Sequence, residues 1–198
     1  MGDKIKTLYN QIVTILLAIG LLAPAGAAEV EGVKLADKAR VSDNGAELVL
    51  NGAGVRTRLL FKIYVGALYL QQKQAAPEAI VADAGAKRVA LHLMREVSSE
   101  QFFGALNDGL KSNHTPEQLA KIEPQIRQLE AIFGSVKSAK NGDVIFIDAV
   151  ADGTRITING EARGTIPGAD FNRALLRIWL GAHPVDAALK KSLLGAGG

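Results

Sequence analysis

Three Asx-Gly dipeptides divide the second half of the chain into short apolar segments. The dipeptides are Asn141-Gly142, Asp152-Gly153 and Asn159-Gly160. They separate residues 144–150, residues 154–158 and a shorter segment near 162–166. An Asx-Gly pair between such segments is the strongest local signal for a β-hairpin. The sequence therefore predicts an antiparallel meander in this region.

The region from Val33 to Leu70 is also predicted to form strands. Residues 46–50 lie between Asn44-Gly45 and Asn51-Gly52, which we expect to be turns. Residues 55–70 are rich in β-branched, aromatic and aliphatic side chains, and the last part, 65–70, is apolar at every position. A strand without polar alternation is expected to be covered on both faces of its sheet.

Helices are predicted between and after these strand regions. Ser98 with Gln101, and Thr115 with Gln118, have the spacing of a capping box. Apolar residues follow each start at helical spacing, and Pro124 should kink or split the second helix. A short helix is expected at 77–82, a strand at 87–94, and two C-terminal helices whose apolar faces are Phe171, Ala174, Leu175, Ile178, Trp179 and Val185, Leu189, Leu193.

Strands, helices, strands and helices follow one another in that order. This order predicts an α+β fold, a mostly antiparallel sheet with helices packed on one face. No internal repeat or low-complexity linker divides the chain, so we expect one domain over residues 29–198.

The first 28 residues have the order of a secretory signal peptide. Lys4 and Lys6 precede an apolar segment at 12–22, and small residues from Ala25 to Ala28 follow. We expect cleavage after Ala27 or Ala28, a periplasmic or secreted protein, and no stable membrane span after cleavage. The apolar segment is shorter than the about 20 residues that a spanning helix needs.

Composition and motifs exclude several classes of site. The chain has no cysteine, its net charge is only +3, and it has no basic stripe, which argues against a thiol nucleophile and a nucleic-acid partner. It lacks a glycine-rich phosphate loop and a nucleophile elbow. His92, His114 and His183 are far apart and lack metal-ligand spacing. We expect no cofactor and no metal; the sequence says nothing about protein partners.

Arg56 and Tyr64 are the candidate functional residues. Arg56 follows two glycines, Gly52 and Gly54, which let the backbone bend or let a ligand approach closely. A guanidinium binds a carboxylate through two hydrogen bonds and keeps its charge when desolvated. In one unbroken strand, however, Arg56 and Tyr64 would lie about 26 Å apart. The alternative that Arg56 and Arg58 are solvated residues of an edge strand stays open.

Several segments, in this order, resemble the chalcone isomerase-like proteins, and in particular their bacterial secreted branch. The matching segments include 51–56, 62–70, 141–143, 159–160, 166–171, 178–181, 184–186 and 193–195. The resemblance implies an open-faced β-sandwich, a large antiparallel sheet with a layer of helices on one face and a ligand cleft between them. Arg56 matches the arginine that stabilises the anion in the plant enzymes. Tyr64 falls where those enzymes have threonine and where their fatty-acid-binding relatives have tyrosine.

Three functional hypotheses follow from this resemblance. The first is non-catalytic binding of a fatty acid or a similar apolar anion, with Arg56, Tyr64, Phe102 and Asn107 as ligand-binding residues. The second is a chalcone isomerase-type lyase acting on a phenolic enone, in which Arg56 and Tyr64 would be catalytic. The third is an interaction module with a closed cleft. The tyrosine at position 64, and the lack of any tyrosine in 98–113, favour the first.

Overall fold

The computed structural model describes residues 28–42 and 45–196. The predicted signal peptide therefore lies outside the described residues, except for its last residue, Ala28. The same holds for Asn44 of the predicted Asn44-Gly45 turn.

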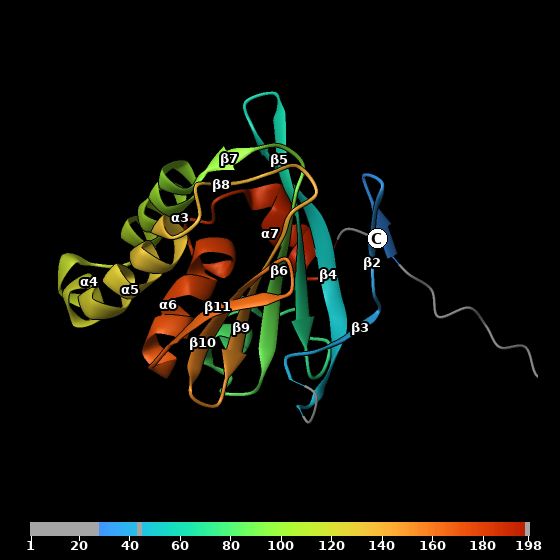
Figure 1. Cartoon of the computed structure of the whole chain (residues 1–198). Helices are drawn as coiled ribbons and strands as arrows, with labels where there is room; N and C mark the ends of the chain where they lie inside the picture. Colours follow the sequence, from blue (N-terminus) through green and yellow to red (C-terminus); the bar gives the residue numbers. More distant parts are fainter. Residues whose placement is uncertain (1–27, 43–44, 197–198) are drawn as a thin grey trace, which may run out of the picture.

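A seven-stranded antiparallel sheet forms the centre of the molecule (Figure 1). Its spatial order is β11-β10-β9-β6-β5-β4-β3. These strands are β3 (Lys38–Arg40), β4 (Glu47–Arg58), β5 (Phe61–Leu70), β6 (Lys87–Leu93), β9 (Val144–Val150), β10 (Gly153–Ile158) and β11 (Glu161–Ile166). Two small ribbons accompany the sheet, β1 (Ala28–Val30) with β2 (Val33–Leu35), and β7 (Val97–Ser98) with β8 (Ser138–Ala139).

The helices lie on one face of this sheet, and β1 and β2 lie on the other (Figure 1). The helices are α2 (Pro77–Ala82), α3 (Ser99–Asn113), α4 (Pro116–Lys121), α5 (Glu123–Gly134), α6 (Ala169–Leu180) and α7 (Ala187–Leu193). The predicted α+β architecture with a one-sided helical layer is confirmed. None of the described helices combines the length and the apolar character that crossing a bilayer requires.

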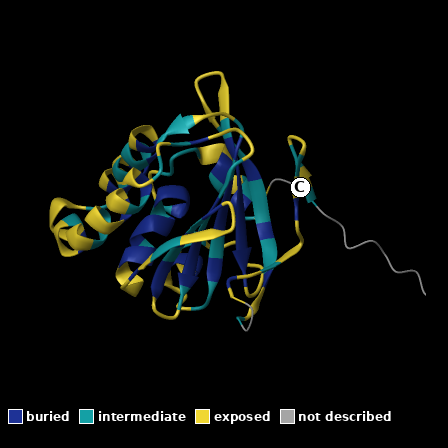
Figure 2. Ribbon diagram, viewed as in Figure 1, coloured by how far each residue is buried: buried dark blue, intermediate teal, exposed yellow. Residues whose placement is uncertain are grey.

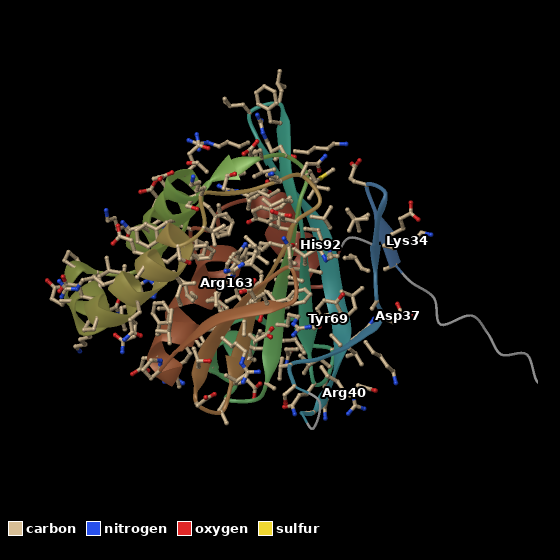
Figure 3. The ribbon with its side chains drawn as sticks, viewed as in Figure 1. Lys34, Asp37, Arg40, Tyr69, His92 and Arg163 are labelled. Carbon is tan, nitrogen blue, oxygen red and sulfur yellow. The ribbon has the colours of Figure 1, made fainter. Side chains whose placement is uncertain are left out.

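Strand β5 is covered on both faces, as its uninterrupted apolar sequence predicts. Tyr64, Leu68 and Leu70 pack into the core under the helices, whereas Val65, Ala67 and Tyr69 pack into a second core under the N-terminal strands. Figure 3 shows Tyr69 on the side of the sheet that faces β2 and β3. Because side chains alternate along a strand, β5 contributes residues to both cores.

The local signals for helix starts and turns are confirmed. Ser98 and Thr115 both form capping boxes, and the helix interrupted by Pro124 is split at Ile122 into α4 and α5. The meander over 144–166 forms β9, β10 and β11, with Asn159 and Gly160 at positive φ in the last turn. These features depend on residues that are close in the sequence, which explains why the sequence predicts them well.

Two predictions about the first strand region are wrong. Residues 55–70 are not one strand, because the chain turns back at Leu59 and Leu60 to form the β4–β5 hairpin. Asn51-Gly52 is not a turn but a bulge within β4, where the register shifts. The Asn51 side chain is buried there and bonds to the backbone of Gln74 and to the carbonyl of Leu193. Through these bonds the bulge connects β4 to the segment after β5 and to the end of α7.

The glycines beside Arg56 accommodate a helix and not a ligand. A Cβ at Gly52 would collide with the backbone carbonyl of Ser192 in α7. A Cβ at Gly54 would lie 2.6 Å from the Ser192 Cβ, and one at Gly66 would lie 3.3 Å from Leu189 Cδ1. The small residues of β4 and β5 therefore let α7 pack directly on the sheet.

We predict that Gly52→Ala destabilises the protein by about 1–3 kcal/mol, because the clash is with backbone that has no room to rotate away. Urea denaturation measures the free energy of unfolding. Gly104→Ala on α3 is the matched control, since its Cβ would meet nothing within 4 Å. This control should be stabilising by about 0.5–1 kcal/mol, because alanine is the better helix former. Equal stability of the Gly52→Ala variant and the parent would contradict the packing role.

Candidate functional site

The β4–β5 hairpin places Arg56 directly opposite Tyr64. The two residues are register partners in the antiparallel ladder. The Arg56 guanidinium carbon lies 5.6 Å from the centre of the Tyr64 ring, within the range of a cation–π interaction. The separation of about 26 Å applies only to an unbroken strand, and the turn at Leu59 and Leu60 removes it.

Tyr64 is buried beneath the C-terminal helix layer. Its side chain is 2% exposed, and its hydroxyl accepts a hydrogen bond of 2.9 Å from Trp179 Nε1 on α6. The indole N–H can only donate, so the hydroxyl keeps its own hydrogen for a second partner. Within residues 28–42 and 45–196, no protein acceptor takes that hydrogen. Tyr64 is therefore a hydrogen-bond donor available to a bound group.

Burial sets the protonation state of Tyr64. Desolvation raises the pKa of its phenol above the ordinary value, and this effect outweighs the opposing influence of the Arg56 charge and the Trp179 N–H. Tyr64 is consequently neutral near pH 7. A neutral phenol can donate a hydrogen bond to an anion, but it cannot act as a general base.

Asp186 lies close to this pair, and each of its carboxylate oxygens accepts a backbone hydrogen bond. It is the N-cap of α7, where one carboxylate oxygen accepts from the Leu189 N–H at 2.9 Å. The other oxygen accepts from the Thr57 N–H at 3.1 Å, next to the second register shift of β4. Arg56 has no carboxylate within 4.0 Å in the described part of the chain. Its charge remains available to an outside anion.

An inner cavity lies between Tyr64 and the helices, and it is very small. Its volume is about 10 Å³, and its wall includes Arg56, Tyr64, Phe102 and Trp179. A space of this size holds about one water molecule. Arg56 and Tyr64 thus line the same hollow, but Trp179 and its neighbours leave little room in it.

A larger outer groove lies beside the inner cavity and shares Arg56, Phe102 and Ala105 with it. Its volume is about 400 Å³. The remaining lining residues come from the β4–β5 hairpin, the segment from the end of β6 into β7, and α3: Arg58, Leu59, Phe61, Ile63, Arg95, Glu96, Val97, Gln101, Gly104 and Asp108. Arg56 therefore lies in the wall that separates the closed inner cavity from the open outer groove.

The structure gathers three of the four predicted ligand-binding residues. Arg56, Tyr64 and Phe102 line the inner cavity, and Arg56 and Phe102 also line the outer groove. Asn107 lies on α3 but is not among the lining residues of either space. Whether these residues bind a ligand stays a prediction. Ile63 and Arg95, which sequence reasoning missed, also line the groove. Ile63 lies on β5, and Arg95 follows β6, where the Met94 N–H donates to the Ile63 carbonyl.

We predict that Tyr64→Phe destabilises the protein by about 1–3 kcal/mol, because the buried Trp179 N–H would lose its acceptor. Urea denaturation at pH 7 tests this. Tyr69→Phe is the matched control, since Tyr69 is equally buried in the second core and its hydroxyl makes no protein hydrogen bond in the described region. Equal losses in both variants would show that the Trp179 bond adds nothing to stability.

The raised pKa of Tyr64 also predicts a pH dependence. Above pH of about 10 the unfolded chain releases a proton that folded Tyr64 retains, so the free energy of unfolding falls as pH rises. Tyr64→Phe should reduce the steepness of this fall, and Tyr69 should account for part of what remains, since burial also raises its pKa. Denaturation midpoints between pH 8 and about 11 measure the slope. An unchanged slope would contradict the buried, neutral state of Tyr64.

Comparison with solved structures supports the architecture. The fold is similar to that of a fatty-acid-binding protein from Arabidopsis thaliana, with a TM-score of 0.64 and 13% sequence identity. The similarity covers 82% of this chain and 92% of the plant protein. At this identity the likeness concerns the fold alone.

Comparison of the sequence with protein families gives a match over nearly the whole described region. No curated protein sequence matches the chain. The sequence model of the chalcone isomerase-like family, by contrast, matches residues 27–195. The chain therefore belongs to the chalcone isomerase-like family.

Proposed function

We propose that this protein binds a fatty acid or a similar apolar anion without transforming it, and that Arg56 fixes the anionic head. The observation that carries the proposal is the position of Arg56. Its guanidinium stands in the wall of the outer groove with no carboxylate within 4.0 Å in the described residues. The fold shared with a plant fatty-acid-binding protein adds support.

The outer groove suits such a ligand in size and in chemistry. Its volume of about 400 Å³ falls within the range of small-molecule sites, about 300–1,000 Å³. Ile63, Val97 and Phe102 supply apolar surface for a tail. The charged lining residues are Arg56, Arg58, Arg95, Glu96 and Asp108. One net positive charge among them complements a single carboxylate.

The inner cavity supplies a second contact for the head. It has room for one water or one carboxylate oxygen, and the Tyr64 hydroxyl faces it with an unused hydrogen. A carboxylate at Arg56 would then accept from Tyr64 directly or through that water. The tail would extend into the outer groove, because Trp179 and Phe102 occupy the space above Tyr64.

The two other hypotheses make different demands on the site. A lyase for a two-ring phenolic substrate needs far more room beside Tyr64 than about 10 Å³. The interaction module is favoured by the small inner cavity, since it requires no ligand there. It differs from the proposal in predicting no saturable lipid binding.

We predict that oleate binds saturably and that Arg56→Ala weakens binding by about 10- to 100-fold, the usual effect of losing a charged hydrogen bond. Trp179 is the only tryptophan and lines the inner cavity, so its fluorescence reports the titration. Arg127→Ala is the matched control, because Arg127 is exposed on α5 and pairs only with Glu123.

Methyl oleate separates head recognition from apolar burial. The ester lacks the negative charge, so the parent should bind it more weakly than oleate, and Arg56→Ala should bind the two alike. Saturable oleate binding with an unaffected Arg56→Ala variant would exclude the arginine clamp. No saturable binding to the parent would favour the closed interaction module.

We propose further that the protein is exported as a member of the bacterial secreted branch. The basis is the order of charged, apolar and small residues in the first 28 positions. Mass spectrometry of the protein from an extracytoplasmic fraction should find residue 28 or 29 at its N-terminus. A cytoplasmic protein with an intact N-terminal segment would contradict the export proposal.

A further inference from the structure

The tip of the β4–β5 hairpin exposes three consecutive large apolar residues. Leu59 is 87% exposed, Leu60 is 93% exposed and Phe61 is 57% exposed. The hairpin projects beyond the neighbouring strands (Figure 1), and its tip is exposed in the burial view (Figure 2). Single exposed apolar residues are ordinary, but a consecutive run of this kind is unfavourable in water unless it serves a contact.

The turn itself does not explain these residues. Leu59 adopts φ of 56°, a left-handed conformation that costs a residue with a side chain roughly 1–2 kcal/mol. The turn between β10 and β11 uses Asn159-Gly160 for its positive φ values, which is the favourable choice. Leucine at position 59 therefore opposes the stability of the turn, and its apolar side chain must contribute in another way.

Positive charges surround the apolar tip. Arg58 precedes it, Lys62 follows it, and the Arg95 guanidinium lies 4.6 Å from the centre of the Phe61 ring. Lys62 pairs with Glu31 at 2.6 Å. Arg58 and Arg95 have no carboxylate within 4.0 Å in the described residues. Apolar side chains within a ring of cations are complementary to the surface of an anionic bilayer.

We propose that the β4–β5 tip is a reversible docking site for an anionic lipid bilayer. Leu59 and Leu60 would enter the boundary between headgroups and acyl chains, while Arg58 and Arg95 would contact lipid phosphates. Leu59, Phe61, Arg58 and Arg95 also line the outer groove, so docking would place the mouth of the groove against lipid. This last step rests on the proposed lipid-binding function; the docking itself does not.

Sedimentation with lipid vesicles tests the docking. Vesicles of phosphatidylglycerol with phosphatidylcholine should retain the protein, and pure phosphatidylcholine should retain much less, with the difference decreasing as salt is added. Leu60→Ser should weaken retention by about tenfold or more, the effect of losing one buried leucine side chain. Arg58→Ala should weaken it by about fivefold. Lys73→Ala is the matched control, because Lys73 is exposed beyond the opposite end of β5.

Two comparisons distinguish vesicle docking at the tip from oleate binding in the groove. An apolar leader left on the chain would itself bind lipid. The parent and each variant are therefore prepared identically and their N-termini are determined. The measured quantity is the ratio of their vesicle retention. Leu60→Ser should still bind oleate, since Leu60 does not line the groove. Arg56→Ala should lose oleate but remain on vesicles.

Several results would overturn the docking proposal. Equal retention of the parent and Leu60→Ser would show that the tip does not contact lipid. Loss of vesicle binding in Arg56→Ala would assign retention to a headgroup held in the groove. Concentration-dependent self-association that Leu60→Ser abolishes, without vesicle binding by the parent, would assign the tip to contact with a second copy of the chain.

Discussion

The antiparallel pairing of Arg56 with Tyr64 is the constraint on which the candidate site depends. The pairing brings a charge and a phenol from adjacent strands to one side of the sheet. Helix α6 then fixes the phenol through Trp179, and α7 holds Asp186 on the backbone beside Arg56. Without this register, the arginine would lie on a solvated strand and the tyrosine would have no charged partner.

The same hairpin explains why the inner cavity is small. Glycines at 52, 54 and 66 remove the side chains that would hold α7 away from the sheet, so the helix layer packs close to Tyr64. Trp179 from α6 bonds to the Tyr64 hydroxyl, and about 10 Å³ remains beside them between sheet and helices. Beside Arg56, the larger space lies in the outer groove, where α3 faces the hairpin. The glycines that let α7 approach the sheet line neither of the two spaces.

The sequence predicts the elements that depend on neighbouring residues and misses the features that depend on tertiary packing. Capping residues, Pro124 and the Asx-Gly turns act on neighbouring residues, so helix starts and the meander could be found. The turn at Leu59 and Leu60 carries no glycine or asparagine. Its only signal was length, because residues 55–70 exceed the usual strand of about 3–10 residues. The Trp179–Tyr64 bond and the cavity volume depend on tertiary packing and could not be read from spacing.

One hairpin therefore carries the Arg56–Tyr64 pair in its ladder and an exposed apolar tip at its turn. The two features are physically related through the groove that connects them. The groove is open on one side, so an acyl chain lying in it would leave part of its apolar surface in water and gain only part of the burial energy. A bilayer against the tip would cover that open side. With the proposed head contact in the sheet and the proposed lipid contact at the turn, the protein would bind a tail that its own core has no room to enclose.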